Sequence, residues 1–215
     1  MITIALPTGR VLKEAIEILE DGGLPVEGLK NPGRELVIEE GSTRYILAKP
    51  MDVPLYVHRG VADLALAGSD VLWESGSQLV ELLDTGRGLC SLQVAGPPEL
   101  SDRFKGHRSE LMGLKVATKY PEIADRHFSR KAIQIDLVHL NGSIELAPRL
   151  GLTDCILDIV QTGSTLKANG LVLLEYVAPV SLRLVASRKG ASTMWDRIGP
   201  LVNSIKKESS QQVAS

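Results

Sequence analysis

The stretch from Asp154 to Gly170 restricts the fold of this chain more than any other segment. An apolar, β-branched run from Cys155 to Val160 is short enough to be a buried strand, and it leads into Gln161-Thr162-Gly163-Ser164-Thr165. A helix should follow, because Ser164 and Thr165 are both good N-terminal caps. The segment therefore predicts a buried strand, a tight glycine turn and a helix N-terminus.

A turn of this kind suits a phosphorylated sugar. Its backbone N–H groups and its hydroxyls point to one place, where the helix dipole favours negative charge. Asp158 lies near the end of the strand, where a carboxylate can accept hydrogen bonds from sugar hydroxyls. The alternative is that Thr-Gly-Ser-Thr only caps a helix, and the motif taken alone leaves both interpretations open.

A second small-residue turn, Asn141-Gly142-Ser143, stands shortly before this segment. It is followed by Ile144-Glu145-Leu146-Ala147-Pro148, so that Glu145 has mainly small and apolar neighbours. A carboxylate in such a setting requires a partner. We therefore favour a functional role for Glu145.

Composition and charge exclude several classes of protein. The chain has 215 residues, 44% of them apolar, which is enough for one large or two small domains. A formal net charge of -2 gives no electrostatic reason to expect nucleic acid as a partner. The N-terminus does not resemble a signal peptide, and no apolar run approaches a membrane span. We expect a cytoplasmic protein with no membrane partner.

The cysteines and histidines show no metal-ligand spacing. Cys90 and Cys155 lie far apart in apolar runs, which predicts two buried thiols. The four histidines are also dispersed, so we expect no metal site formed by the chain itself.

Strands and helices alternate along the chain. Residues Ile2 to Leu6 and Ala62 to Ala67 are predicted strands that lead, through turns at Gly9 and Gly68, into helices. The same pattern recurs after Ser109, which predicts two α/β units.

Breaks at Gly96 and Pro179 suggest that the chain leaves the first unit and later returns to it. We expect a discontinuous first lobe of residues 1–95 and 180–207, a second lobe of residues 96–179 with the loop that suits a phosphorylated sugar, and a polar tail at 208–215. The last predicted helix, about 193–207, has an apolar face formed by Met194, Ile198, Leu201 and Ile205. This face either packs in the core of the first lobe or is a docking surface, and we favour the core.

The run from Leu140 to Leu171 resembles the ribose-phosphate site of ATP phosphoribosyltransferase, the first enzyme of histidine biosynthesis. Matches extend through nearly the whole chain, at Ala5-Leu6-Pro7-Thr8-Gly9-Arg10, Asp52-Val53-Pro54, Gly60-Val61-Ala62-Asp63, Gly68-Ser69-Asp70 and Val116-Ala117-Thr118-Lys119-Tyr120-Pro121. The resemblance implies an α/β, two-lobed fold like that of the type II periplasmic binding proteins, with a cleft between the lobes. It also implies condensation of ATP with 5-phosphoribosyl 1-pyrophosphate to N1-(5-phosphoribosyl)-ATP and pyrophosphate, with Mg²⁺ accompanying the pyrophosphate substrate.

The resemblance also assigns the residues that bind phosphoribosyl pyrophosphate. These are the phosphate-loop and ribose-binding residues, Thr162, Gly163, Ser164, Thr165, Glu145 and Asp158. Arginines matching Arg10 and Arg34 lie near the pyrophosphate in the family, and we expect both to be catalytic. One departure is Thr8, which stands where the first turn of the family commonly has lysine.

The chain resembles the short form of the family, which works with a separate regulatory subunit related to histidyl-tRNA synthetase. We therefore expect a hetero-oligomer, which is a hetero-octamer in the family, and no histidine inhibition of the isolated chain. Two other functions remain open. A solute-binding protein would not need Thr-Gly-Ser-Thr after Asp158. A nucleobase-salvage phosphoribosyltransferase has two adjacent acids before Thr-Gly, whereas Ile159 and Val160 follow Asp158 here.

Overall fold

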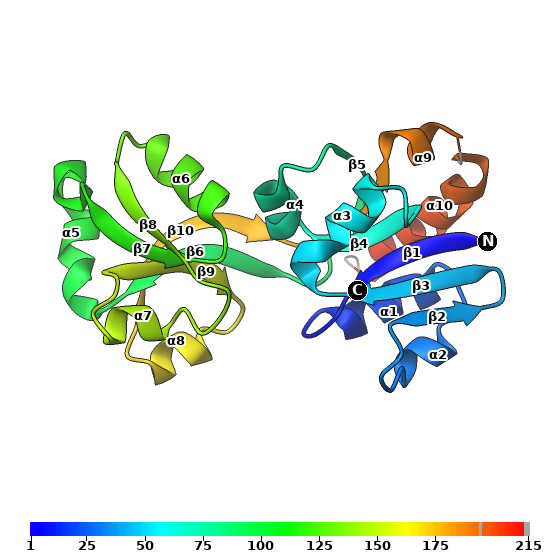
Figure 1. Ribbon diagram of the computed structural model, residues 1–215, viewed down its shortest axis with the longest axis horizontal. Helices are drawn as coiled ribbons and strands as arrows, with labels where there is room; N and C mark the ends of the chain where they lie inside the picture. Colours follow the sequence, from blue (N-terminus) through cyan, green and yellow to red (C-terminus); the bar gives the residue numbers. More distant parts are fainter. Residues whose placement is uncertain (194, 213–215) are drawn as a thin grey trace. The chain divides into compact units, whose positions relative to one another are not determined.

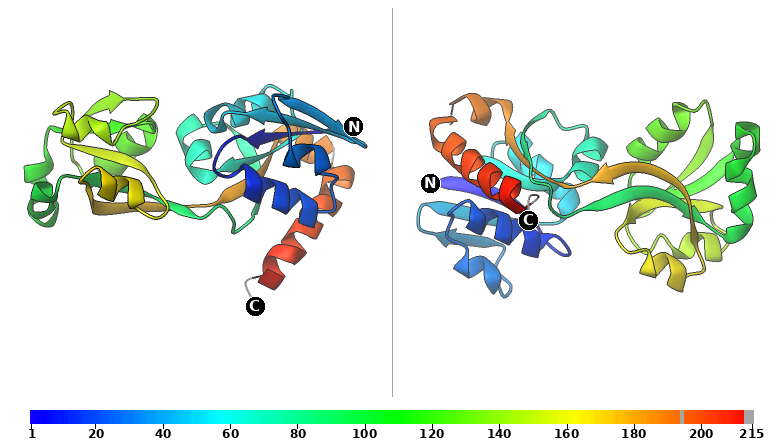
Figure 2. Two further views of the ribbon diagram at one scale, coloured as in Figure 1. Left: turned by 90° about the horizontal axis from the view of Figure 1, so that it is seen from below. Right: turned by 180° about the vertical axis from the view of Figure 1, so that it is seen from behind.

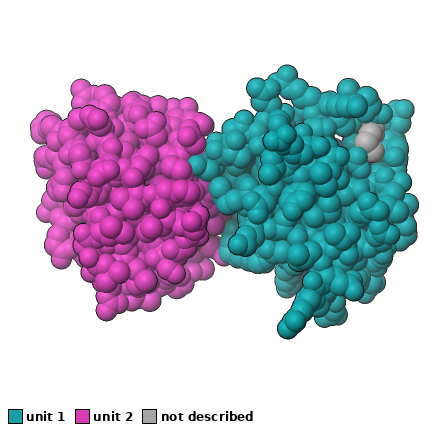
Figure 3. Space-filling model, viewed as in Figure 1, with its two compact units in different colours: residues 1–89, 181–215 teal, residues 90–180 magenta. Residues whose placement is uncertain are grey.

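The computed structural model describes residues 1–193 and 195–212 and divides the chain into two compact α/β units (Figure 1). Unit 1 contains Met1–Leu89 and the segment from Ser181 onward, and unit 2 contains Cys90–Val180 (Figure 3). Each unit has its own sheet. Unit 1 is therefore discontinuous in sequence, because the chain leaves it once and returns.

The sheet of unit 1 has six strands in the order β2-β3-β1-β4-β11-β5. Its strands are β1 (Ile2–Pro7), β2 (Val37–Glu40), β3 (Thr43–Ala48), β4 (Leu64–Gly68), β5 (Leu79–Asp84) and β11 (Leu182–Ser187). Its helices are α1 (Leu12–Asp21), α2 (Glu27–Lys30), η1 (Pro50–Asp52), α3 (Val53–His58), α4 (Ser69–Ser75), α9 (Arg188–Thr193) and α10 (Trp195–Gln212).

Alternation along the strands sends side chains to two apolar layers, one on each face of this sheet. Ile4 of β1 belongs to a cluster with α1 and α10, while its neighbour Ala5 belongs to a cluster with Val53 and Val57 of α3. Both faces of the sheet are thus covered by apolar side chains.

The sheet of unit 2 has five strands in the order β10-β6-β9-β7-β8. Its strands are β6 (Cys90–Gly96), β7 (Leu114–Thr118), β8 (Ile135–His139), β9 (Cys155–Val160) and β10 (Val172–Val180). Its helices are η2 (Pro98–Leu100), α5 (Ser101–Lys105), η3 (Arg108–Leu111), α6 (Pro121–Ser129), α7 (Leu146–Arg149) and α8 (Ser164–Ala168). Figures 1 and 2 show α6 on one face of the sheet and α7 and α8 on the other.

The boundary expected at Gly96 is wrong by one strand. Residues 90–95, assigned to the first lobe from sequence, form β6, which pairs with β9 and β10 in unit 2. The return to unit 1 falls one residue after the boundary expected at Pro179, because β10 continues through the proline to Val180 and unit 1 resumes at Ser181. Proline is tolerated there because β10 is an edge strand.

The C-terminal segment forms two helices, α9 and α10, where the sequence predicted one. Helix α10 continues to Gln212, so residues 208–212 of the expected polar tail are helical, while 213–215 lie outside the described residues. Met194 also lies outside them. The other members of the apolar face, Ile198, Leu201 and Ile205, are buried in the core of unit 1, which confirms the core interpretation. In the described ranges, no helix is long and apolar enough to span a bilayer.

Candidate active site

The turn after β9 leads into a helix as its sequence predicts, but the N-cap position belongs to Gly163, and neither Ser164 nor Thr165 caps α8 through its side chain. Gly163 has a φ of 73°, a left-handed conformation that favours glycine, and α8 begins at the next residue. The Oγ atoms of Thr162 and Ser164 are 3.0 Å apart, and Thr162 Oγ1 accepts the Ser164 N–H at 3.5 Å. Thr162, Ser164 and Thr165 are all exposed. The turn therefore presents three hydroxyls to solvent from a folded backbone.

Helix α8 has only five residues, so we assign little of the anion attraction to its dipole. More comes from the hydroxyls and from the N–H groups of the first turn, which have no intrahelical partner in any helix. Leu166 fixes the start of α8 against the sheet, since it packs in one apolar cluster with Ile144, Ala147 and Ile156. The hydroxyl-bearing turn is thus held in place by apolar packing.

Asp158 is the buried carboxylate of unit 2 nearest to this turn along β9. It is only 7% exposed, and its Oδ1 atom is buried with no hydrogen-bond partner. Its Oδ2 atom lies 3.6 Å from Nζ of Lys119. Burial raises the pKa of Asp158, the Lys119 ammonium and the Ile159 backbone N–H oppose that rise, and the charge of Glu145 adds to it. One carboxylate oxygen is thus paired with a cation, and the other has acceptor capacity for a ligand.

Glu145 lies near enough to Asp158 for its negative charge to raise the pKa of that carboxyl, and it follows a turn with a strained backbone. Ser143 has a φ of 49°, which is uncommon for a residue other than glycine and is typical of functional segments. The next residue, Ile144, is fully buried and anchors the turn, and half-buried Glu145 then directly precedes α7. The structure therefore brings Glu145, Asp158 and the hydroxyl turn together in unit 2.

Arg10 and Arg34 belong to the other unit. Strands β1 and β3 run parallel and end side by side at Pro7 and Ala48. Strand β2 is antiparallel to β3, so that it begins at this same edge of the sheet. Arg10, which follows Gly9 with its φ of 87°, and Arg34 are exposed at the surface near this edge. Two cations expected from sequence thus lie off one edge of unit 1.

The described residues contain no group of three or more His, Cys, Asp or Glu side chains arranged to hold a metal ion. The two cysteines are free thiols. Cys155 is buried as expected, and burial raises its pKa, whereas Cys90 is only half-buried, contrary to the sequence prediction.

Comparison with known proteins identifies the family. The sequence model for ATP phosphoribosyltransferase matches residues 49–207 of this chain. The chain belongs to the ATP phosphoribosyltransferase family. It is 40% identical over 204 residues to an ATP phosphoribosyltransferase of Caldanaerobacter subterraneus, covering 94% of both chains. It is 48% identical over 189 residues to an ATP phosphoribosyltransferase of a Geobacillus species, covering 87% of this chain and 88% of the relative.

Solved structures confirm the fold class predicted for this ATP phosphoribosyltransferase family member. It superimposes with a TM-score of 0.81 and 28% identity on a chain of the ATP phosphoribosyl transferase (HisG:HisZ) complex from Thermotoga maritima, covering 98% of this chain and 100% of that one. The periplasmic aliphatic sulphonate binding protein SsuA of Escherichia coli is similar in fold alone, with a TM-score of 0.62 at 13% identity over 99% of this chain and 74% of that one. The α/β fold is therefore that of the type II periplasmic binding proteins.

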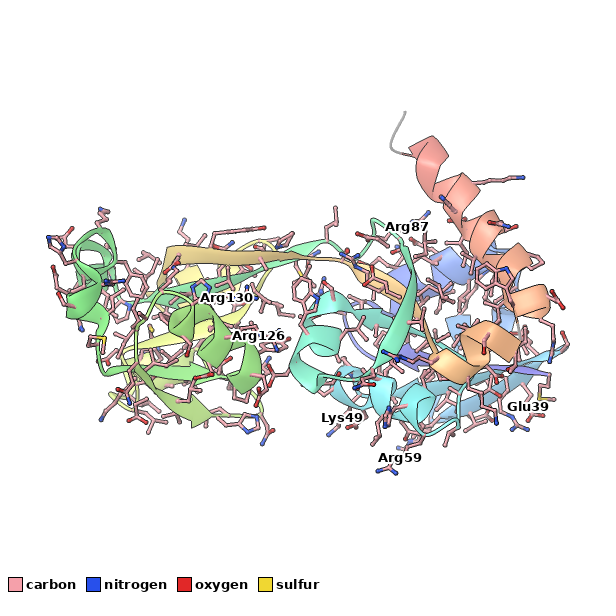
Figure 4. The ribbon with its side chains drawn as sticks, turned by 90° about the horizontal axis from the view of Figure 1, so that it is seen from above. Glu39, Lys49, Arg59, Arg87, Arg126 and Arg130 are labelled. Carbon is pink, nitrogen blue, oxygen red and sulfur yellow. The ribbon has the colours of Figure 1, made fainter. Side chains whose placement is uncertain are left out.

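Sequence reasoning assigned no role to two lysines of this ATP phosphoribosyltransferase family member that lie next to expected site residues. Lys49 directly follows β3, and the Thr8 N–H and hydroxyl both donate to the Ala48 carbonyl, at 2.8 and 3.1 Å. Lys49 is therefore adjacent to the position where the family commonly has lysine, and Figure 4 labels it in unit 1. The second is Lys119, beside Asp158. Both lysines could have been found from the sequence, because each is a basic residue directly after a predicted strand.

Proposed function

We propose that this protein condenses ATP with 5-phosphoribosyl 1-pyrophosphate to give N1-(5-phosphoribosyl)-ATP and pyrophosphate, the first step of histidine biosynthesis. One observation carries the assignment of the site. The strand that ends in the exposed hydroxyl turn also bears Asp158, whose buried Oδ1 lacks a partner. A phosphorylated pentose requires both features, an oxyanion site and an acceptor for sugar hydroxyls. Membership of the family supports the proposal.

In this proposal the residues of unit 2 bind the ribose 5-phosphate. Thr162, Gly163, Ser164 and Thr165 bind the phosphate, because the turn offers exposed hydroxyls and backbone N–H groups. Asp158 accepts a hydrogen bond from a ribose hydroxyl through Oδ1, and Glu145 acts on the same sugar. The two carboxylates also favour the positive charge that develops on a sugar ring in a loose transition state.

Arg10 and Arg34 stabilise the departing pyrophosphate in this proposal. Adenine N1 is an unprotonated lone pair at neutral pH, so its attack on ribose C1 needs no strong general base. The leaving group, by contrast, gains negative charge as its bond to C1 breaks, and preformed cations stabilise that charge. Lys49 adds a third positive charge near the same edge of unit 1.

We propose that Mg²⁺ enters with phosphoribosyl pyrophosphate. Proteins usually hold this ion through one or two carboxylates together with substrate phosphates and water. It would neutralise part of the charge on the pyrophosphate, and we assign none of its ligands to a residue of this chain.

We also propose a separate regulatory subunit related to histidyl-tRNA synthetase, in a hetero-octamer. Support comes from the similar chain of Thermotoga maritima, which belongs to a HisG:HisZ complex. In such an assembly the second subunit would supply the inhibition by histidine. Mixing the two proteins and measuring the mass of the complex by light scattering tests this part of the proposal.

The reaction itself is tested by the absorbance of the product. The purified chain, alone and with the cognate second subunit, is given ATP, Mg²⁺ and phosphoribosyl pyrophosphate. We expect product with the wild type, a large loss for Asp158→Asn, and no loss for Asp136→Asn, which changes an exposed acid on β8, the edge strand two positions from β9 in the same sheet. Absence of product under both conditions would overturn the assignment. Free nucleobases replacing ATP, and calorimetry with amino acids, test the salvage-enzyme and solute-binding alternatives.

A further inference from the structure

We infer that Lys119 is a positioning residue of the pentose site, which keeps the Asp158 carboxylate ionised and oriented so that Oδ1 stays open to a sugar hydroxyl. The identity of that sugar rests on the proposed function. The effect of Lys119 on Asp158 does not, because it follows from contacts within unit 2.

The backbone register places Lys119 beside Asp158. Strands β7 and β9 run parallel, with Thr118, the last residue of β7, opposite Leu157. The residues that follow these two along the chain are Lys119 and Asp158. The Thr118 hydroxyl donates to the Leu157 carbonyl at 2.7 Å and accepts the Tyr120 N–H at 2.9 Å. Both neighbours of Lys119 are buried, which fixes its backbone against the strand that carries Asp158.

The side chains divide the two carboxylate oxygens between two roles. Lys119 Nζ lies 3.6 Å from Oδ2 of Asp158, whereas Oδ1 is buried without a partner. On the other side of β9, Gln93 of β6 stands opposite Asp158, but its amide donates to Ser91 Oγ at 2.8 Å. The cation therefore holds one oxygen, and the neighbouring amide is directed elsewhere along β6.

The charges around Asp158 explain why it needs this lysine. Burial and the negative charge of Glu145 both favour the protonated acid, while the Lys119 ammonium and the Ile159 backbone N–H favour the carboxylate. The side chains that β6 contributes at this point, Gln93 and Ser91, are uncharged. Removing the ammonium therefore raises the pKa of Asp158 further. A protonated Asp158 loses its negative charge and part of its acceptor capacity.

The first test needs no ligand. The carboxyl carbon of Asp158 is followed by ¹³C NMR as a function of pH in the wild type, Lys119→Met and Lys119→Arg. We expect the titration midpoint to rise in Lys119→Met and to stay near the wild-type value in Lys119→Arg. Lys115→Met is the matched control, because it removes an exposed lysine from β7, the strand that Lys119 directly follows, at a position farther from Asp158. An unchanged midpoint in Lys119→Met would overturn the inference.

The second test is the dissociation constant of phosphoribosyl pyrophosphate as a function of pH. At pH values below the raised titration midpoint of Asp158, we expect Lys119→Met to bind the substrate more weakly than the wild type does. The loss of affinity should reach about tenfold for each pH unit by which the midpoint has risen, and affinity should recover at higher pH. In an Asp158→Asn background the same substitution should change affinity by less than about twofold, because the residue through which it acts is gone. An equal loss at every pH would instead show a direct contact between Lys119 and phosphate, and would refute a positioning role.

The two tests separate this inference from the proposed function. If the wild type does not bind phosphoribosyl pyrophosphate, the proposed function fails, while the NMR midpoint still decides whether Lys119 holds Asp158 ionised.

Discussion

Thr118→Val should weaken both unit 2 and its pentose site. The Thr118 hydroxyl is fully buried at the end of β7 and joins two backbone groups, the Leu157 carbonyl and the Tyr120 N–H. Valine has nearly the same shape, so the substitution removes these hydrogen bonds and leaves the packing almost unchanged. It therefore isolates the contribution of one hydroxyl to the position of Lys119 beside Asp158.

The expected cost follows from the two bonds. A buried donor that loses its acceptor costs about 1–3 kcal/mol, which applies to the Tyr120 N–H. The bond to the Leu157 carbonyl adds about 0.5–1.5 kcal/mol, the net value of an ordinary hydrogen bond. We therefore expect the free energy of unfolding of unit 2 to fall by roughly 2–4 kcal/mol.

The assay must report on unit 2 directly. Both tryptophans of the chain, Trp73 and Trp195, belong to unit 1, so their fluorescence does not follow unit 2. Hydrogen exchange of peptides from β7 and β9, measured by mass spectrometry, gives the local free energy of opening. The dissociation constant of phosphoribosyl pyrophosphate, measured by calorimetry, reports on the site.

Thr85→Val is the matched control. Thr85 is also buried, and its hydroxyl donates to the Leu182 carbonyl at 2.8 Å and accepts the Arg87 N–H at 3.3 Å, but it lies in unit 1. We expect Thr85→Val to destabilise unit 1 and to leave affinity for the substrate unchanged, whereas Thr118→Val weakens that affinity several-fold. Protection of β7 and β9 within about 0.5 kcal/mol of the wild type would refute the reasoning, since such a change is typical of a surface site.

Three further outcomes are expected. Thr162→Ala and Thr165→Val should each weaken binding of phosphoribosyl pyrophosphate by about 1.5–3 kcal/mol, because each removes a hydroxyl donor to a charged phosphate; unchanged calorimetric affinities for both would exclude the turn from the site. Arg10→Ala should lower kcat more than it raises KM in steady-state kinetics, because the pyrophosphate charge grows as the bond breaks, and Arg34→Ala should act in the same direction. An effect on KM alone would make Arg10 a ground-state binder. Ile198→Ala should lower the free energy of unfolding of unit 1 by about 2–5 kcal/mol in a denaturant titration followed by tryptophan fluorescence, and a loss below 1 kcal/mol would contradict its place in the core.

Local sequence was most informative where the backbone conformation depends on neighbouring residues. The β-branched run before Gly163 and the Ser and Thr residues after it predicted β9, the turn and α8, and the structure has all three, although Gly163 and not Ser164 or Thr165 occupies the N-cap position. The first turn, at Gly9, was predicted for the same reason. At Gly68 the glycine has another cause. Its φ is not left-handed, and a Cβ atom there would collide with the carboxylate of Asp70.

Prediction was weaker where an element is defined by pairing across the sheet. A break at Gly96 looked like a domain boundary, although β6 before it belongs to unit 2 by its pairing with β9 and β10. Pro179 looked like the end of a strand, but an edge strand needs no donor on its outer side. Helix α2 was not predicted because its four residues are too few to show a helical period.

The sequence by itself determined the hydroxyl turn, the carboxylates Asp158 and Glu145, and the family to which the chain belongs, because residue type and spacing over short distances carry that information. Only the tertiary structure brought Lys119 next to Asp158. Their contact depends on the register of β7 against β9, and a register between strands far apart in sequence leaves no local pattern. Burial of the Asp158 side chain, which makes the lysine necessary, likewise arises only when β9 is covered on both sides within its sheet.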